Sequence, residues 1–187
     1  MSDQRVPLVD PATATDAQRE VIRRGQRDRP YVPKVYATVA NHPDLALPWL
    51  RFGSALLYHG TIPGRDREIL ILRAARNAAA PYEWGQHVPF GRREGLEDVE
   101  IEAISAPGDP SDSSLSAWDR LLCSAADELD TQARLSEASW LALGGRYSNE
   151  QRMEACFVVG QYTMLAYVLN SAAVTAEDGA PALGQAR

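Results

Sequence analysis

Two residues of this sequence, a glutamate and a histidine one helical turn apart, have the types and spacing of an acid–base pair. Glu83 and His87 lie four residues apart in the run YEWGQH, so on a helix both side chains project from the same face. A carboxylate in that position can hold an imidazole in one tautomer and raise its basicity, as proton transfer requires. The alternative for such a pair is a solvated helix face or a structural histidine.

Glu68 is the third member of this candidate site. It is expected in the first turn of the preceding helix, and Pro81 forces a sharp turn before the next helix begins. An antiparallel pairing of the two helices would bring Glu68 toward Glu83 and His87, where two carboxylates and an imidazole would shift each other's pKa. We expect His87 to act as the general acid or base, Glu83 to orient it, and Glu68 to complete the relay.

The elements that must position these residues are helical throughout. Apolar residues recur with helical periodicity, and no stretch alternates as a strand does, so the sequence predicts a single all-α domain. The expected helices cover 16–27, 43–58 (with a later start if Pro48 shifts it), 65–79, 81–94, 96–104, 115–129, 136–143 and a long final helix opened by a capping box of Ser148 and Gln151.

Three parts are expected along the chain. Residues 1–33 form an N-terminal arm with a short helix, residues 34–176 the helical domain, and residues 177–187 a flexible tail. A loop is expected over 106–113, which is rich in Pro, Gly, Ser and Asp.

Composition limits the classes of partner and the compartment. The chain has 187 residues, with 19 Lys+Arg against 25 Asp+Glu and a net charge of −6, which disfavours nucleic acid and anionic membranes as partners. The two cysteines, Cys123 and Cys156, are far apart and form no CxxC motif, which fits a reducing compartment. The polar stretch 1–11 lacks the apolar core of a signal peptide, so we expect a cytoplasmic protein.

The stretch 155–174 is nearly all apolar and is long enough to span a bilayer. It nevertheless contains Gln161, Thr163, Asn170 and Ser171, and burying amide side chains in lipid is costly. We therefore interpret it as the central helix of a protein core rather than a membrane span.

The run RDREILILRAARNAAAPYEWGQHVPFGRREGLEDVEIEAI resembles the carboxymuconolactone decarboxylase family, which also contains alkylhydroperoxidase D. The later run DELDTQARLSEASWLALGGRYSNEQRMEACFVVGQYTMLAYVLN resembles the C-terminal half of the same family. The resemblance implies an all-α helical bundle of the alkylhydroperoxidase D-like type, assembled as a trimer or hexamer with the site near a subunit interface. It also implies a small-molecule substrate and no cofactor or metal.

The sequence departs from the peroxidase branch of this family at both thiols. In that branch a glutamate precedes a CxxC by twelve residues and a histidine follows the second cysteine by four. With this spacing the glutamate is Glu68 and the histidine is His87, whereas the cysteine positions hold Ala80 and Glu83. A carboxylate cannot form the mixed disulfide of thiol peroxidase chemistry.

The resemblance and this departure together favour a cofactor-free enzyme that decarboxylates, isomerises or hydrates a small carbonyl compound or lactone. Tyr82 and Trp84 are candidates for lining the substrate pocket, although Trp84 could equally be a core residue. One alternative is a residual peroxidase that uses Cys123 or Cys156, and another is a non-catalytic binding or assembly module. Glu68, Glu83 and His87 could also ligate a divalent metal, but no HExxH or equivalent motif is present, and we expect none.

Overall fold

The computed structural model describes residues 4–27, 29–108 and 114–184, and these residues form nine helices and no strand. The helices are α1 (Asp16–Gln26), α2 (Lys34–Val39), α3 (Pro43–Tyr58), α4 (Gly64–Asn77), α5 (Pro81–Arg93), α6 (Asp98–Ser105), α7 (Ala117–Gln132), α8 (Glu137–Leu143) and α9 (Asn149–Ser171). The prediction of an all-α fold is confirmed. Residues 109–113 of the expected loop, and residues 1–3, 28 and 185–187 of the expected arm and tail, lie outside the described residues.

Local sequence signals set most of the helix starts. Ser148 caps α9 by accepting a hydrogen bond from the backbone N–H of Gln151, and the Gln151 side chain completes the predicted capping box. Pro43 and Pro81 occupy the first turns of α3 and α5, where the missing N–H costs no helical hydrogen bond. Pro48 does not delay the start of α3 but lies inside that helix.

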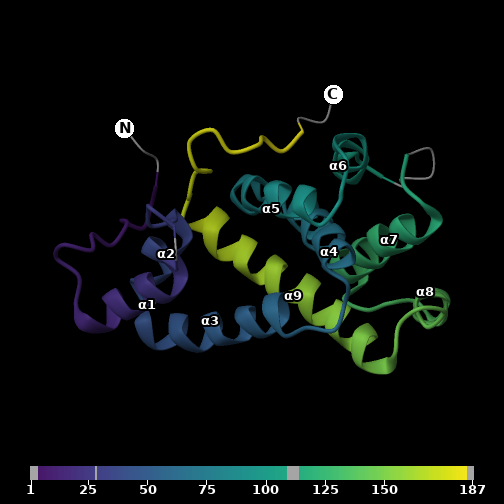
Figure 1. The fold of residues 1–187 in the computed structure, drawn as a ribbon, viewed down its shortest axis with the longest axis horizontal. Helices are drawn as coiled ribbons and strands as arrows, with labels where there is room; N and C mark the ends of the chain where they lie inside the picture. The colour runs from purple at the N-terminus through teal and green to yellow at the C-terminus, as the bar shows by residue number, and fades with distance from the viewer. Residues whose placement is uncertain (1–3, 28, 109–113, 185–187) are drawn as a thin grey trace.

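The long helix α9 runs through the middle of the molecule, with α3 on one side of it and α4 and α5 on the other (Figure 1). The helix α4 packs against α5, α7 and α9, and its segment Ile69–Leu72 is completely buried in the main core. No helix within the described parts of the chain is both long enough and apolar enough to cross a membrane. The apolar run at the C-terminal end therefore forms the central helix that the sequence predicts.

The N-terminal helices close one end of this bundle. The helix α1 contacts both α2 and α3, and a Cβ atom on Gly25 of α1 would lie 2.1 Å from the ring of Tyr36. Glycine therefore permits α1 to approach α2 closely. The six-residue helix α2, which lies between Pro33 and the start of α3, was not expected from the sequence.

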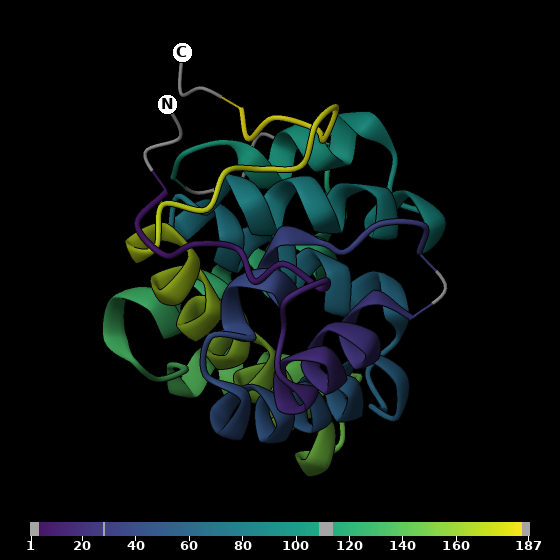
Figure 2. The same ribbon diagram turned by 90° about the vertical axis from the view of Figure 1, so that its left-hand side faces the viewer.

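The C-terminal segment leaves α9 beside α2 and passes over α5 toward α6 (Figures 1 and 2). The carboxylate of Glu177 accepts hydrogen bonds from the backbone N–H of Lys34 at 2.7 Å and from the hydroxyl of Tyr82 at 2.9 Å. Ala180 lies so close to Gly85 that a Cβ atom there would be 2.9 Å from the Cβ of Ala180. The described part of the segment that we expected to be a flexible tail, residues 177–184, is therefore held by specific contacts.

Candidate active site

A helical hairpin of α4 and α5 brings Glu68 and His87 together. After α4 ends, Ala79 adopts a positive φ of 46°, and the N–H of Ala80 donates to the carbonyl of Ala75 at 2.8 Å, which reverses the chain. The carboxylate Oε2 of Glu68 then lies 2.8 Å from Nδ1 of His87. The approach predicted from the turn at Pro81 is present in the structure.

Glu68, rather than Glu83, is the hydrogen-bond partner of the His87 imidazole. Both Glu68 and His87 are buried, and Nε of Arg67 lies 3.4 Å from the second oxygen of Glu68. A carboxylate at Nδ1 favours the tautomer with the proton on Nδ1, which leaves Nε2 of a neutral imidazole as a base. The expectation that Glu83 orients His87 is therefore wrong, because the helix hairpin places Glu68 nearer than the i,i+4 spacing places Glu83.

Glu83 is buried without a hydrogen-bonded cation, and this determines its chemistry. Its side chain is 3% exposed, and none of the described residues donates a hydrogen bond to its carboxylate. Burial raises the pKa of Glu83 to about 7, and the nearby His87 opposes part of that rise. A carboxyl group with this pKa can both donate and accept a proton near neutral pH.

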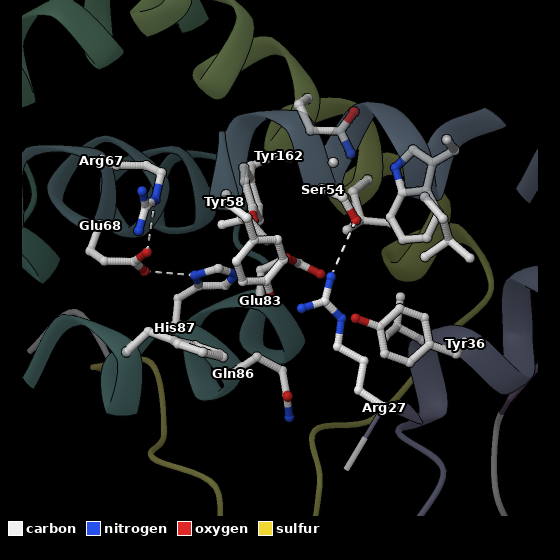
Figure 3. Close-up of a pocket in the computed structure, with 18 of the residues that line it drawn as sticks. Arg27, Tyr36, Ser54, Tyr58, Arg67, Glu68, Glu83, Gln86, His87 and Tyr162 are labelled. Carbon is white, nitrogen blue, oxygen red and sulfur yellow. Dashed lines mark hydrogen bonds and ion pairs between the residues drawn. The ribbon is translucent and has the colours of Figure 1, made fainter. Parts of the chain in front are cut away.

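These three side chains line a cavity of about 340 Å³ that is formed by α3, α4, α5 and α9 and by the N-terminal helices. Figure 3 shows Arg67, Glu68 and His87 on one side of this cavity and Arg27, Tyr36 and Ser54 on the other. The volume lies at the lower end of the range for small-molecule sites. Acid–base groups therefore face a space of substrate size.

Two cavity residues from α9 were not recognised as site residues from the sequence. Tyr162 stacks edge-on to the His87 ring, with 4.7 Å between ring centroids, and burial together with Glu83 and Glu68 raises its pKa well above 10. It therefore remains a hydrogen-bond donor. The amide oxygen of Gln161 is buried without a partner among the described residues, and this amide in the mostly apolar stretch 155–174 was the sequence signal that could have indicated a site.

The two expected pocket aromatics occupy different places. Tyr82 lines the cavity, although its hydroxyl is engaged by Glu177 and by the N–H of Val35 at 3.1 Å. Trp84 is buried in the main core and is not among the residues that line the cavity. Of the two interpretations kept open for Trp84, the structure places it as a core residue.

Neither cysteine lines the cavity. Cys123 is completely buried in the main core, and burial raises its pKa to about 12. Burial also raises the pKa of Cys156 on α9. Thiolates are the reactive form of cysteine, so these positions do not support the thiol alternative. Within ranges 4–27, 29–108 and 114–184, no three His, Cys, Asp or Glu side chains form a group that could hold a metal ion.

Solved structures with the same architecture share little sequence with this chain. An uncharacterised peroxidase-related protein from Ralstonia eutropha JMP134, described as an alkylhydroperoxidase AhpD core, superimposes with a TM-score of 0.80 at 18% identity, over 93% of this chain and 92% of that one. An uncharacterised peroxidase-related protein from Silicibacter sp. TM1040 superimposes with a TM-score of 0.77 at 16% identity, over 92% of this chain and 90% of that one. A variant of the debrominase Bmp8 in complex with 2,3,4-tribromopyrrole superimposes with a TM-score of 0.72 at 16% identity, over 95% of this chain and 94% of that one.

The fold is therefore all-α and of the alkylhydroperoxidase D-like type. Residues 43–122 match the carboxymuconolactone decarboxylase family. The matched stretch, which is less than half of the chain, includes all of α4 and α5. No curated protein sequence matches the chain.

Proposed function

We propose that this protein is a cofactor-free enzyme that moves protons on a small carbonyl or lactone substrate, in a decarboxylation, an isomerisation or a hydration. The observation that carries the proposal is a buried Glu83 with a pKa of about 7 that shares a cavity with the Glu68–His87 pair.

The two acid–base groups take complementary roles. In an enolisation, Nε2 of His87 removes a proton from the carbon beside the carbonyl group. The C–H electron pair forms the C=C bond, and protonated Glu83 delivers its proton to the carbonyl oxygen, which gives an enol. Glu68 stabilises the imidazolium that forms, through its 2.8 Å contact with Nδ1. Return of a proton to a different carbon completes an isomerisation.

Hydrogen–deuterium exchange in D₂O tests this proposal and requires no assumption about the product. A panel of β-keto acids, simple ketones and lactones is incubated with the protein, and loss of the proton beside the carbonyl is followed by NMR. Glu83→Gln and His87→Asn should each slow exchange by about 10²–10⁴-fold, the usual range for general acid–base catalysis. Glu102→Gln, on the exposed face of α6, is the matched control and should leave exchange unchanged.

The proposal is wrong if a substrate of the panel exchanges equally fast with wild type and with both variants. Absence of exchange across the whole panel would instead favour the non-catalytic alternative.

We also propose that the protein is a homo-oligomer, as the family resemblance implies. Large apolar side chains on α9 are exposed in the single chain, among them Phe157 at 52% and Tyr167 at 63%. Several large exposed apolar side chains on one helix favour an interaction site there. Both cysteines are unpaired, and a cytoplasmic location remains the proposal that fits free thiols.

A further inference from the structure

Arginine side chains gather on the cavity of a chain whose net charge is −6. Five of them line it: Arg24 of α1, Arg27 and Arg29 beyond it, Arg67 of α4 and Arg93 of α5. Arg24, Arg27 and Arg93 are exposed to solvent as well, so they border the opening. A cavity opening lined with positive charge attracts and concentrates anions.

Two of these guanidinium groups already have carboxylate partners. Arg24 pairs with Glu20 at 2.6 Å, and Arg67 lies 3.4 Å from Glu68. These pairs reduce the charge that Arg24 and Arg67 offer to a ligand.

Arg27, like Arg29 and Arg93, differs from these two, because among the residues that the structure describes no carboxylate pairs with it. Its guanidinium lies 4.0 Å from the ring centroid of Tyr58, and Nη2 donates to Oγ of Ser54 at 3.5 Å. These two contacts hold the group in place and leave several N–H donors unused. Figure 3 shows the guanidinium turned into the cavity, toward the side on which Glu83 and His87 lie.

The backbone of Arg27 supports a specific role. It ends α1 with φ 50° and ψ −125°, a conformation that non-glycine residues seldom adopt. Strained residues of this kind concentrate at ligand clamps and active sites. The strain fixes the direction in which the side chain leaves the helix.

The rest of the lining suits the organic body of a ligand. Trp49, Leu57, Phe90 and Leu165 line the cavity together with the charged groups. An anion that fits this space therefore has an apolar part and is not a bare inorganic ion.

We infer that the cavity binds a small organic carboxylate, that Arg27 recognises its anionic group, and that the reacting carbonyl lies toward Glu83 and His87. The second half of this inference rests on the proposed function, whereas the binding of the carboxylate does not. An ion pair with a guanidinium stabilises the carboxylate form. The anchored carboxylate is therefore a recognition group and is not the group that leaves.

Binding of matched acids and amides tests the inference. The probes are 4-oxopentanoate with 4-oxopentanamide and benzoate with benzamide, titrated by calorimetry and by the fluorescence of Trp49, which lines the cavity. We expect each acid to bind at least about tenfold more tightly than its amide, because a charge-assisted hydrogen bond is lost in the amide. The preference should weaken as salt is added, because Arg27 is exposed.

Arg27→Gln should weaken binding of the acids about tenfold and leave binding of the amides unchanged. Arg23→Gln is the matched control, because Arg23 lies on α1, the helix that Arg27 caps, pairs with Glu20 and does not line the cavity. Equal binding of acids and amides, equal behaviour of the two arginine variants, or no binding of either acid at millimolar concentration would each overturn the inference.

The same titrations on Glu83→Gln separate this inference from the proposed function. Arg27-dependent binding of the acids without any proton exchange by wild type would contradict the function and leave the anion site standing. Proton exchange that depends on Glu83 but not on Arg27 would contradict the anion site and leave the proposed function standing.

Discussion

The carboxylate of Glu68 lies 2.8 Å from Nδ1 of His87, on the neighbouring helix, whereas Glu83 shares a helix with His87 and makes no hydrogen bond to it. We therefore propose that the two glutamates have separate tasks. Glu68 fixes the imidazole and balances its charge, and Glu83 remains available to exchange a proton with a ligand.

This division predicts the tautomer of His87. In wild type the neutral imidazole should carry its proton on Nδ1, which ¹⁵N NMR of the ring nitrogens distinguishes from the Nε2-protonated form. Glu68→Gln removes the charge and lets both tautomers form, and we expect proton exchange on a panel substrate to fall by about 10²-fold or more. An Nε2-protonated wild type would contradict the assignment, and Glu102→Gln should match wild type.

The buried Glu83 predicts that stability falls as pH rises. Its pKa increases from 4.5 in the unfolded chain to about 7 in the folded protein, so the folded state holds the proton more tightly between these values. At about 1.4 kcal/mol per pH unit, the lost stability reaches about 3 kcal/mol above pH 7. Glu83→Gln has no charge to bury and should be more stable than wild type at pH 8 by up to this amount.

Urea unfolding of both proteins from pH 4 to pH 9 measures this difference. The two curves should nearly coincide near pH 4.5, separate through pH 7, and run parallel above it. A constant difference at every pH would show that Glu83 does not titrate in this range.

Both cysteine thiols should be unreactive in the folded protein. With Cys123 buried in the core and its pKa raised to about 12, it should react with a disulfide reagent only in denaturant. Dithiol-dependent peroxide reduction should be absent in wild type and in the Cys123→Ser/Cys156→Ser double variant alike. Activity present in wild type and lost in the double variant would restore the peroxidase alternative.

The docked C-terminal segment should contribute to stability. Glu177→Ala removes the acceptor for the N–H of Lys34 and the hydroxyl of Tyr82, and two lost hydrogen bonds of this kind cost about 1–3 kcal/mol. The neighbouring Asp178→Ala, an exposed position, should cost almost nothing. Equal melting temperatures of the two variants would show that the segment is not held by these contacts.

Assembly through α9 has its own test. Light scattering should give a mass that is a multiple of 20.5 kDa, and Tyr167→Lys should lower it, because a charge would be buried in the interface. A wild-type monomer would contradict the proposal. The control is Val99→Lys, at an exposed position of α6, which should leave the mass unchanged.

Sequence periodicity and capping signals were sufficient for most of the helices, including the turn that brings Glu68 to His87. They could not separate the roles of Glu68 and Glu83, because i,i+4 spacing describes one helix and the decisive contact lies between two helices. The short helix α2 was missed because six residues (Lys34–Val39) are too few to show a period.

The remaining cavity residues could not be found from local patterns. Arg27 and Tyr162 are separated by most of the chain, and only the packing of α1 and α9 against α3 places them around one space. The departure from the CxxC pattern was different, because the absence of cysteines between Glu68 and His87 is visible in the sequence.

The contact between Lys34 and Glu177 joins positions 143 residues apart, and the cavity draws its walls from both ends of the chain. During synthesis α1 and α2 leave the ribosome long before α9 and the C-terminal segment. Glu177 of that segment accepts the hydrogen bond from Lys34 at the start of α2. The hairpin of α4 and α5 can form early from local contacts, since short sequence separations close quickly. The cavity is thus completed only after α9 has emerged.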